Sequence, residues 1–214
     1  MKLAPLIKNK RPGLVLPEEF YHEQNVVKIA RSLLGKVLVS NIDDQYTSGI
    51  IVETEAYSGQ NDRASHAFGD RNTNRTGVMY QPGGRAYVYL IYGMYHLLNV
   101  VTNVEGKPDA VLIRAIEPLD GIEHMLKRRN QQKLTPNLTN GPGKLTIALG
   151  INLEHYGVSL LGDILFIEDR GIILKDEQIA SGPRVGVEYA AEDALRPWRF
   201  WVKDNPFVSK VRGK

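Results

Sequence analysis

The chain has 214 residues, and 43% of them are hydrophobic, which is enough to bury a sizeable core in one domain. Its 27 basic and 24 acidic residues give a formal net charge of +3, a mild basicity that is compatible with a polyanionic partner. The absence of cysteine excludes disulfides, thiolate nucleophiles and cysteine metal sites. No apolar run reaches the roughly 18 residues that span a bilayer, and no secretory signal begins the chain. A soluble intracellular protein without membrane contact is therefore expected.

The first part of the chain predicts an arm, a helix and two strands. Residues 1–17 are basic and interrupted by prolines, so we expect a loosely held arm before a single domain over residues 18–214. From Pro17 the apolar spacing predicts one amphipathic helix that ends before Gly35. Strands are expected over residues 36–39 and 47–57. The polar, glycine-containing stretch that follows, up to Gly84, has the length of a functional loop.

Residues 85–102 predict a β-hairpin. The alternation of residues 85–91 is interrupted at Gly93 and resumes at residues 96–102, which places Tyr92 at the tip. An exposed aromatic side chain at such a tip can act as a wedge between stacked bases. A tyrosine that packs back on its own hairpin is equally compatible with the pattern.

The remaining elements are shorter. Strands outnumber helices and short turns join them, which predicts an α+β domain with a curved, mostly antiparallel sheet, surrounding helices and a protruding hairpin. The C-terminal aromatic residues are expected in the core, with Arg196 and Arg199 on the exposed side. We expect strands at 110–116, 164–168 and 184–189, and helices at 119–129 and 144–149.

Two carboxylates end the strand over residues 47–57. Glu53 and Glu55 are two residues apart, and side chains at that spacing project from the same face of a strand. The pair could serve acid–base chemistry or form ion pairs with arginines on a sheet surface. His66 follows in the long loop, but no metal-ligand spacing accompanies it, so we expect no metal and no cofactor.

Several separate motifs in this chain resemble the alkyladenine (3-methyladenine) DNA glycosylase family. The resemblance extends from about Leu33 to Ser209 with the motifs in the same order and at similar spacing. The motifs that carry it are Val52–Tyr57, Tyr87–Tyr95, Ala110–Pro118, Ser181–Val187 and Arg196–Phe200.

The resemblance implies a DNA glycosylase domain that flips a damaged purine out of duplex DNA and hydrolyses its N-glycosidic bond. Glu55 matches the general base of the family, and Arg114 matches an arginine near the attacking water. Glu53 would have a supporting role. Because no lysine lies within the Glu55 motif, a monofunctional enzyme is expected.

The resemblance also implies roles in binding. Tyr57, His66 and Tyr89 match the aromatic walls that sandwich the flipped base. Asn99 matches a residue that would reject guanine by a clash with its 2-amino group. Tyr92 matches the tyrosine that intercalates from the minor groove.

Two other functions remain open at this stage. A glycoside hydrolase would use Glu53 and Glu55 but would not need the tyrosine hairpin. A non-catalytic minor-groove protein would use Tyr92 but would have no use for Glu55. With a glycosylase, the expected partner is duplex DNA that contains damaged purines, and the expected state is a monomer. The enzyme would be cytoplasmic and nucleoid-associated in a bacterium, or nuclear in a eukaryote.

Overall fold

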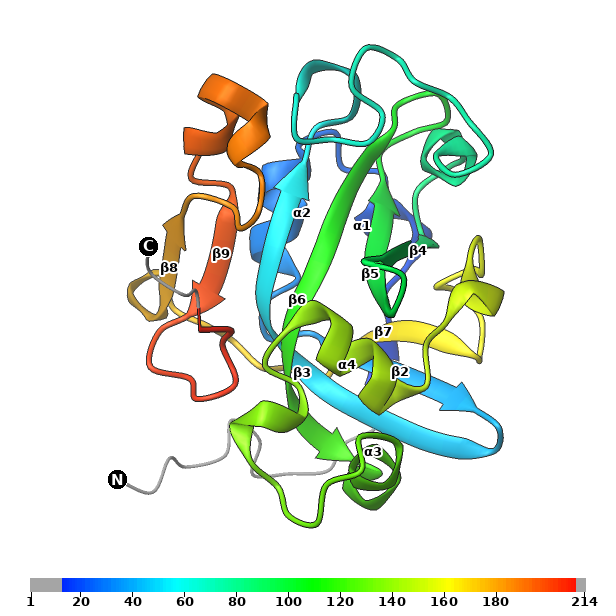
Figure 1. Ribbon diagram of the computed structural model, residues 1–214, viewed down its shortest axis with the longest axis vertical. Coiled ribbons are helices and arrows are strands. Elements are labelled where there is room, and N and C mark those ends of the chain that lie inside the picture. The colour runs from blue at the N-terminus through cyan, green and yellow to red at the C-terminus, as the bar shows by residue number, and fades with distance from the viewer. Residues whose placement is uncertain (1–12, 211–214) are drawn as a thin grey trace.

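The protein, described by a computed structural model over residues 13–210, is built around one nine-stranded antiparallel sheet (Figure 1). Seven strands follow the order β1-β7-β2-β3-β6-β5-β4, while β9 pairs with both β3 and β8. The strands are β1 (Leu14–Val15), β2 (Val37–Ile42), β3 (Gln45–Tyr57), β4 (Arg85–Ile91), β5 (Tyr95–Thr102), β6 (Asp109–Asp120), β7 (Leu165–Asp169), β8 (Ile179–Gly182) and β9 (Arg199–Val202).

Within residues 13–210, four α-helices and six short 3-10 helices surround this sheet. Helix α2 contacts β3 and β6, whereas α4 contacts β5 and β6, and both helices contribute side chains to the main core. The α-helices are α1 (Glu18–Tyr21), α2 (Val26–Ser32), α3 (Ile122–Arg128) and α4 (Pro142–Leu149). The 3-10 helices are η1 (Gly59–Asn61), η2 (Gly77–Tyr80), η3 (Pro136–Leu138), η4 (Leu153–His155), η5 (Asp176–Gln178) and η6 (Glu188–Leu195).

The predicted α+β class and the mostly antiparallel sheet are confirmed. The longest strand, β3, has 13 residues, and nearly all of it is buried. It has neighbours on both edges along much of its length because β2 pairs with its first part and β9 with residues 53–55, while β6 covers the other edge. A strand enclosed in this way needs apolar and β-branched residues, as the segment Gly49–Val52 provides.

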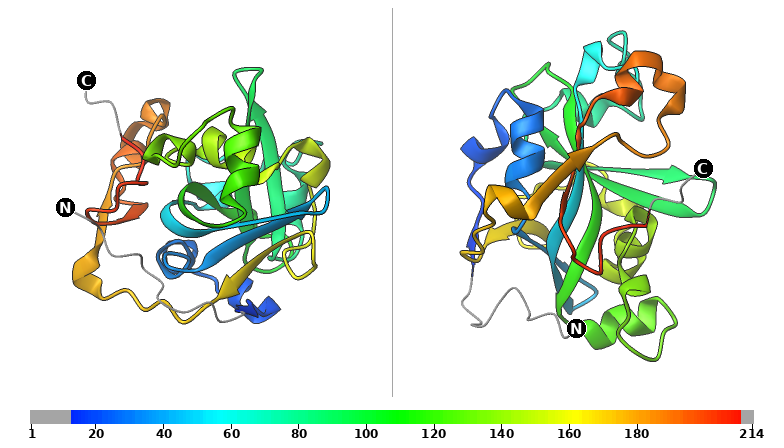
Figure 2. Two further views of the ribbon diagram at one scale, coloured as in Figure 1. Left: turned by 90° about the horizontal axis from the view of Figure 1, so that it is seen from below. Right: turned by 90° about the vertical axis from the view of Figure 1, so that its left-hand side faces the viewer.

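The hairpin is also as predicted. Strands β4 and β5 pair from Arg85 and Val101 to Ile91 and Tyr95, and Figure 2 shows them projecting from the body of the protein. The turn contains Tyr92 at a φ of 53° and Gly93 at 69°. Because the side chain of Tyr92 is 83% exposed, the alternative in which it packs back on the hairpin is wrong.

Some expected elements were wrong in their extent. The single helix from Pro17 is divided into α1 and α2, because Asn25 accepts a hydrogen bond from the Lys28 amide at 3.1 Å and starts a new helix. The helix expected over residues 119–129 begins only at Ile122, since β6 continues to Asp120.

The strand expected over residues 184–189 does not form. This stretch is an irregular segment that leads into η6, and the Val185 amide donates to a carboxylate instead of a neighbouring strand. At the other end of the chain, residues 1–12 of the expected arm lie outside the described residues. Leu14 and Val15 are not loosely held, because they pair with β7 as β1.

Within the described residues, no helix combines the length and the apolar composition that crossing a membrane requires.

Candidate active site

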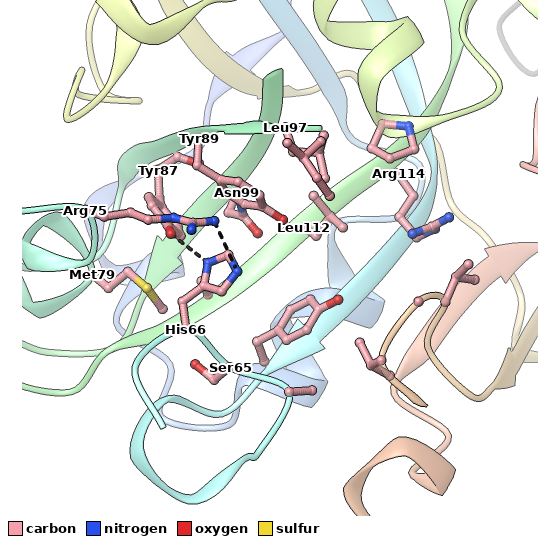
Figure 3. A pocket seen from close by; sticks show the side chains of 18 of the residues that line it. Ser65, His66, Arg75, Met79, Tyr87, Tyr89, Leu97, Asn99, Leu112 and Arg114 are labelled. Atoms are coloured by element: carbon pink, nitrogen blue, oxygen red, sulfur yellow. Dashed lines mark hydrogen bonds between the residues drawn. The ribbon is translucent and has the colours of Figure 1, made fainter. Parts of the chain in front are cut away.

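A cavity of about 580 Å³ opens beside the hairpin (Figure 3). In the hairpin register, Tyr87 lies opposite Asn99 and Tyr89 lies opposite Leu97, so these four side chains project from one face of β4 and β5. All four line the cavity. The same cavity is lined by Tyr57 from β3, Leu112 and Arg114 from β6, Ser65, His66, Arg75 and Met79 from the long loop, and Val185, Val187 and Tyr189 from the segment before and within η6.

Irregularities in the β3–β6 pairing lie at the end of the cavity where the carboxylates are. Glu53 is paired with Ala115 and Thr54 with Ile113, so the register leaves Arg114 without a partner on β3. Such bulges change the direction of a side chain. Arg114 Nε lies 3.1 Å from Glu53 Oε1, and its Nη1 lies 3.3 Å from Glu55 Oε1. The two carboxylates therefore contact the same guanidinium group.

Glu55 is fully buried, and three donors surround its carboxylate. Oε1 accepts the Val185 amide at 2.8 Å and faces Arg114, while Oε2 accepts the Tyr57 hydroxyl at 2.7 Å. Burial and the nearby Glu55 charge raise the pKa of Tyr57 well above its ordinary value, so this hydroxyl stays a donor. The carboxylate is therefore fixed in one orientation at the cavity wall.

Glu53 has a different environment, inside a buried network of ion pairs. Its Oε1 accepts Arg199 Nε at 2.7 Å and the Ser209 hydroxyl at 2.8 Å, and its Oε2 accepts the Ser209 amide at 2.7 Å. Arg199 was expected to be exposed, but it is buried because Glu53 provides its counter-charge. Burial alone would lower the pKa of Arg114, but Glu55 and Glu53 raise it above the ordinary value, so this guanidinium remains charged.

His66 occupies one side of the cavity with the two tyrosines of β4. Its ring meets that of Tyr89 edge to face at 4.7 Å, and Nδ1 lies 2.7 Å from the Tyr87 hydroxyl. Nε2 lies 3.3 Å from Nη2 of Arg75, which can only donate, so Nε2 accepts and Nδ1 carries the proton. Burial and the Arg75 charge lower the pKa of His66 to about 4, and the ring is therefore neutral near pH 7.

Tyr57 has a charged group against its ring. The guanidinium of Arg184 lies 4.8 Å from the ring centroid, and it forms a buried ion pair with Asp62, whose oxygens also accept the Ala64 amide. Asp62 therefore ties the start of the long loop to the segment that holds Val185. Neither Asp62 nor Arg184 was identified from the sequence as part of the site.

The two remaining predicted residues have opposite degrees of exposure. Asn99 is buried, and its Nδ2 donates to the Tyr87 carbonyl at 3.1 Å, which holds the amide group in one direction. Tyr92 lines the outer end of the cavity while most of its side chain is exposed. The structure thus places Tyr57, His66, Tyr89, Tyr92, Asn99 and Arg114 around one cavity, and Glu55 directly behind Tyr57 and Arg114.

Several neighbours of these residues were not predicted. Strand alternation could have identified Tyr87, Leu97 and Leu112, because each lies two residues from a predicted residue on the same strand. The sequence offers no local signal for Ser209 or Val185, because their contacts with the carboxylates are set by tertiary packing.

The residue types at the cavity limit its chemistry. No lysine lines the cavity in the described part of the chain. Within residues 13–210, no group of three or more His, Asp or Glu side chains could hold a metal ion. Among the described residues, the charged and polar side chains at the cavity are thus the Glu55 carboxylate, two guanidinium groups, several phenols, a neutral imidazole, the Ser65 hydroxyl and the Asn99 amide.

Comparison with known proteins gives a consistent result. A family model described as methylpurine-DNA glycosylase (MPG) matches residues 19–206. A protein of Bacillus thuringiensis named "Putative 3-methyladenine DNA glycosylase" is 52% identical over 202 residues, covering 91% of this chain and 98% of its own. A protein of the same name from Bacillus cereus is 51% identical over 205 residues, with the same coverage.

Proposed function

Because the chain belongs to the methylpurine-DNA glycosylase family, we propose that it removes purines of the 3-methyladenine type, alkylated or deaminated, from duplex DNA. The reaction is hydrolysis of the N-glycosidic bond, the first step of base excision repair. The observation that carries this proposal is the position of Glu55. Its buried carboxylate lies against the side of an aromatic cavity of about 580 Å³ that can hold a single base.

In this reaction Glu55 acts as the general base. It accepts a proton from a water molecule as the oxygen attacks the anomeric carbon, and the base leaves with the electrons of the C–N bond. The carboxylate charge also stabilises the oxocarbenium-like transition state. Arg114, which lies 3.3 Å from Glu55 Oε1, orients the carboxylate and the water.

The target base must leave the stack to reach this carboxylate. Tyr92, at the tip of the projecting hairpin, enters the duplex and fills the vacated space, which is supported by its 83% exposure. The flipped base stacks between Tyr57 and the pair formed by His66 and Tyr89. Asn99, fixed by its bond to the Tyr87 carbonyl, excludes a purine with a 2-amino group such as guanine.

The enzyme is proposed to be monofunctional, because the cavity has no lysine among the described residues that could form a Schiff base. We propose that it acts as a monomer on DNA, in the cytoplasm next to the nucleoid, since the relatives named above come from bacteria.

The other two functions explain fewer of these features. A glycoside hydrolase requires two carboxylates that act together, but Glu53 is already engaged by Arg114, Arg199 and Ser209. A non-catalytic minor-groove protein has no use for a buried carboxylate at a base-sized cavity.

The test is release of free base from methylated duplex DNA. We expect the parent protein to release 3-methyladenine and to leave an abasic site without cutting the strand. A protein that binds the same DNA but releases no base would support the minor-groove alternative, and strand cleavage that is coupled to base release would contradict a monofunctional enzyme.

A further inference from the structure

Arg75 places a positive charge beside the aromatic wall of the base cavity. Its guanidinium carbon lies 4.8 Å from the centroid of the Tyr89 ring, and Nη2 lies 3.3 Å from His66 Nε2. Figure 3 shows the Arg75 side chain extending toward His66. A cation over a tyrosine ring at this distance is attracted by the ring quadrupole.

The charge of Arg75 is not compensated, unlike that of the other guanidinium groups around the cavity. Arg114 is paired with Glu53 and Glu55, and Arg184, which lies over Tyr57, is paired with Asp62. Among the described residues, no carboxylate lies within ion-pair distance of Arg75. Within the described residues, its side chain contacts the neutral groups of Tyr89, His66 and Tyr87.

A positively charged base that stacks on Tyr89 would share this ring with Arg75. An alkylated purine such as 3-methyladenine, which has no 2-amino group, carries a positive charge in DNA, and it gains cation–π attraction by stacking on Tyr89. Because Arg75 already lies over that ring, a positively charged base gains less attraction from the ring and is repelled by the Arg75 charge. A neutral purine such as hypoxanthine stacks on the same ring without this repulsion.

We propose that Arg75 is a specificity-determining residue, whose positive charge at the Tyr89 ring shifts the preference of the cavity from positively charged toward neutral damaged bases. This inference rests on the proposed function. It explains how a cavity with aromatic walls can lack a preference for positively charged bases. Arg75 does this by charge and position and takes no part in proton transfer.

The test compares Arg75→Gln with Arg75→Lys at pH 8, where His66 is neutral in every variant. Single-turnover base release is measured on two duplexes that differ only in the damaged base, 3-methyladenine or hypoxanthine. We expect Arg75→Gln to raise the ratio of the two rates, 3-methyladenine over hypoxanthine, by roughly ten-fold. Arg75→Lys keeps the charge and should keep a ratio close to that of the parent.

A ratio is the informative quantity because a lost phosphate contact weakens both reactions equally and cancels. Arg71→Gln is the matched control, since Arg71 is exposed on the same loop and does not line the cavity, and its ratio should be unchanged. If one base is released too slowly to measure, the dissociation constants for the same two duplexes give the same comparison. They are measured with Glu55→Gln added to every variant.

An unchanged or lowered ratio in Arg75→Gln, by rate or by affinity, would overturn the inference while leaving the proposed function intact. The proposed function itself would fail in a different way, through absence of base release from every damaged duplex by the parent protein.

Discussion

The hydroxyl of Tyr57 donates a 2.7 Å hydrogen bond to Oε2 of Glu55, which joins a wall of the base cavity to the carboxylate behind it. A base that stacks on the Tyr57 ring is thereby held at a fixed position relative to the proposed general base. The other carboxylate oxygen is held from the opposite segment of the chain by the Val185 amide. In the proposed function, binding geometry and catalytic geometry therefore depend on the same residue.

Tyr57→Phe should separate these two roles. The variant keeps the ring that stacks on the base but loses a hydrogen bond to a charged group, which contributes about 1.5–3 kcal/mol. We expect single-turnover base release to fall by roughly ten-fold or more, with little change in affinity for the damaged duplex. Equal rates for variant and parent would show that the hydroxyl does not position Glu55.

Glu53→Gln should affect stability and catalysis together. The substitution removes a charge that Arg114 and Arg199 share in a buried setting, and breaking a buried ion pair costs about 3–5 kcal/mol when one partner remains charged. We expect a lower free energy of unfolding in urea, and slower base release because Arg114 loses one of its two anchors. Glu117→Gln, on the partly buried end of β6, is a control that keeps this network. Parent-like stability of Glu53→Gln would argue against the network.

Tyr92→Ser should weaken binding to damaged DNA without changing the fold. The side chain is 83% exposed, so its removal costs no core packing, while a lost wedge or stacking contact costs about 1–3 kcal/mol. We expect at least about a five-fold rise in the dissociation constant for a damaged duplex, measured by fluorescence anisotropy. Ile173→Ser, at an 88% exposed position away from the cavity, should bind like the parent. Parallel behaviour of the two variants would exclude the wedge.

His66 should make stability depend on pH. Burial and then Arg75 lower its pKa to about 4 in the folded chain, below the value of about 6.5 in the unfolded chain. Between these values the unfolded state binds more protons, so the free energy of unfolding falls as the pH decreases from 6.5 to 4, by on the order of 2 kcal/mol. His66→Gln lacks this contribution. In urea titrations, the difference in the free energy of unfolding between parent and variant should therefore shrink toward pH 4. If the two free energies changed equally with pH, His66 would not be a buried neutral imidazole.

The sequence predicts the strands of this fold better than the contacts of its side chains. The hairpin over residues 85–102 and the strand ending at Tyr57 follow from alternation and β-branched composition, which are local properties. The same alternation brings Tyr89 and Asn99 to one face, so much of the cavity wall follows from the hairpin register.

What the sequence does not predict depends on contacts between distant segments. Residues 184–189 have the composition of a strand, yet Arg184 bonds to Asp62 and the Val185 amide to Glu55, which removes them from any ladder. Arginine is usually an exposed residue, but Arg199 is paired in the interior with Glu53, which lies 146 positions earlier in the chain. The bulge at Arg114 is likewise visible only in the register of β3 and β6.

The central claim, that Glu55 activates the water, is tested most directly by Glu55→Gln on a duplex with one 3-methyladenine-type lesion. Glutamine can still accept the Val185 amide and leaves the cavity its shape, so lesion binding should persist. We predict a loss on the order of 10³-fold in single-turnover base release, with a dissociation constant close to that of the parent. Base release at the parent rate would contradict the account.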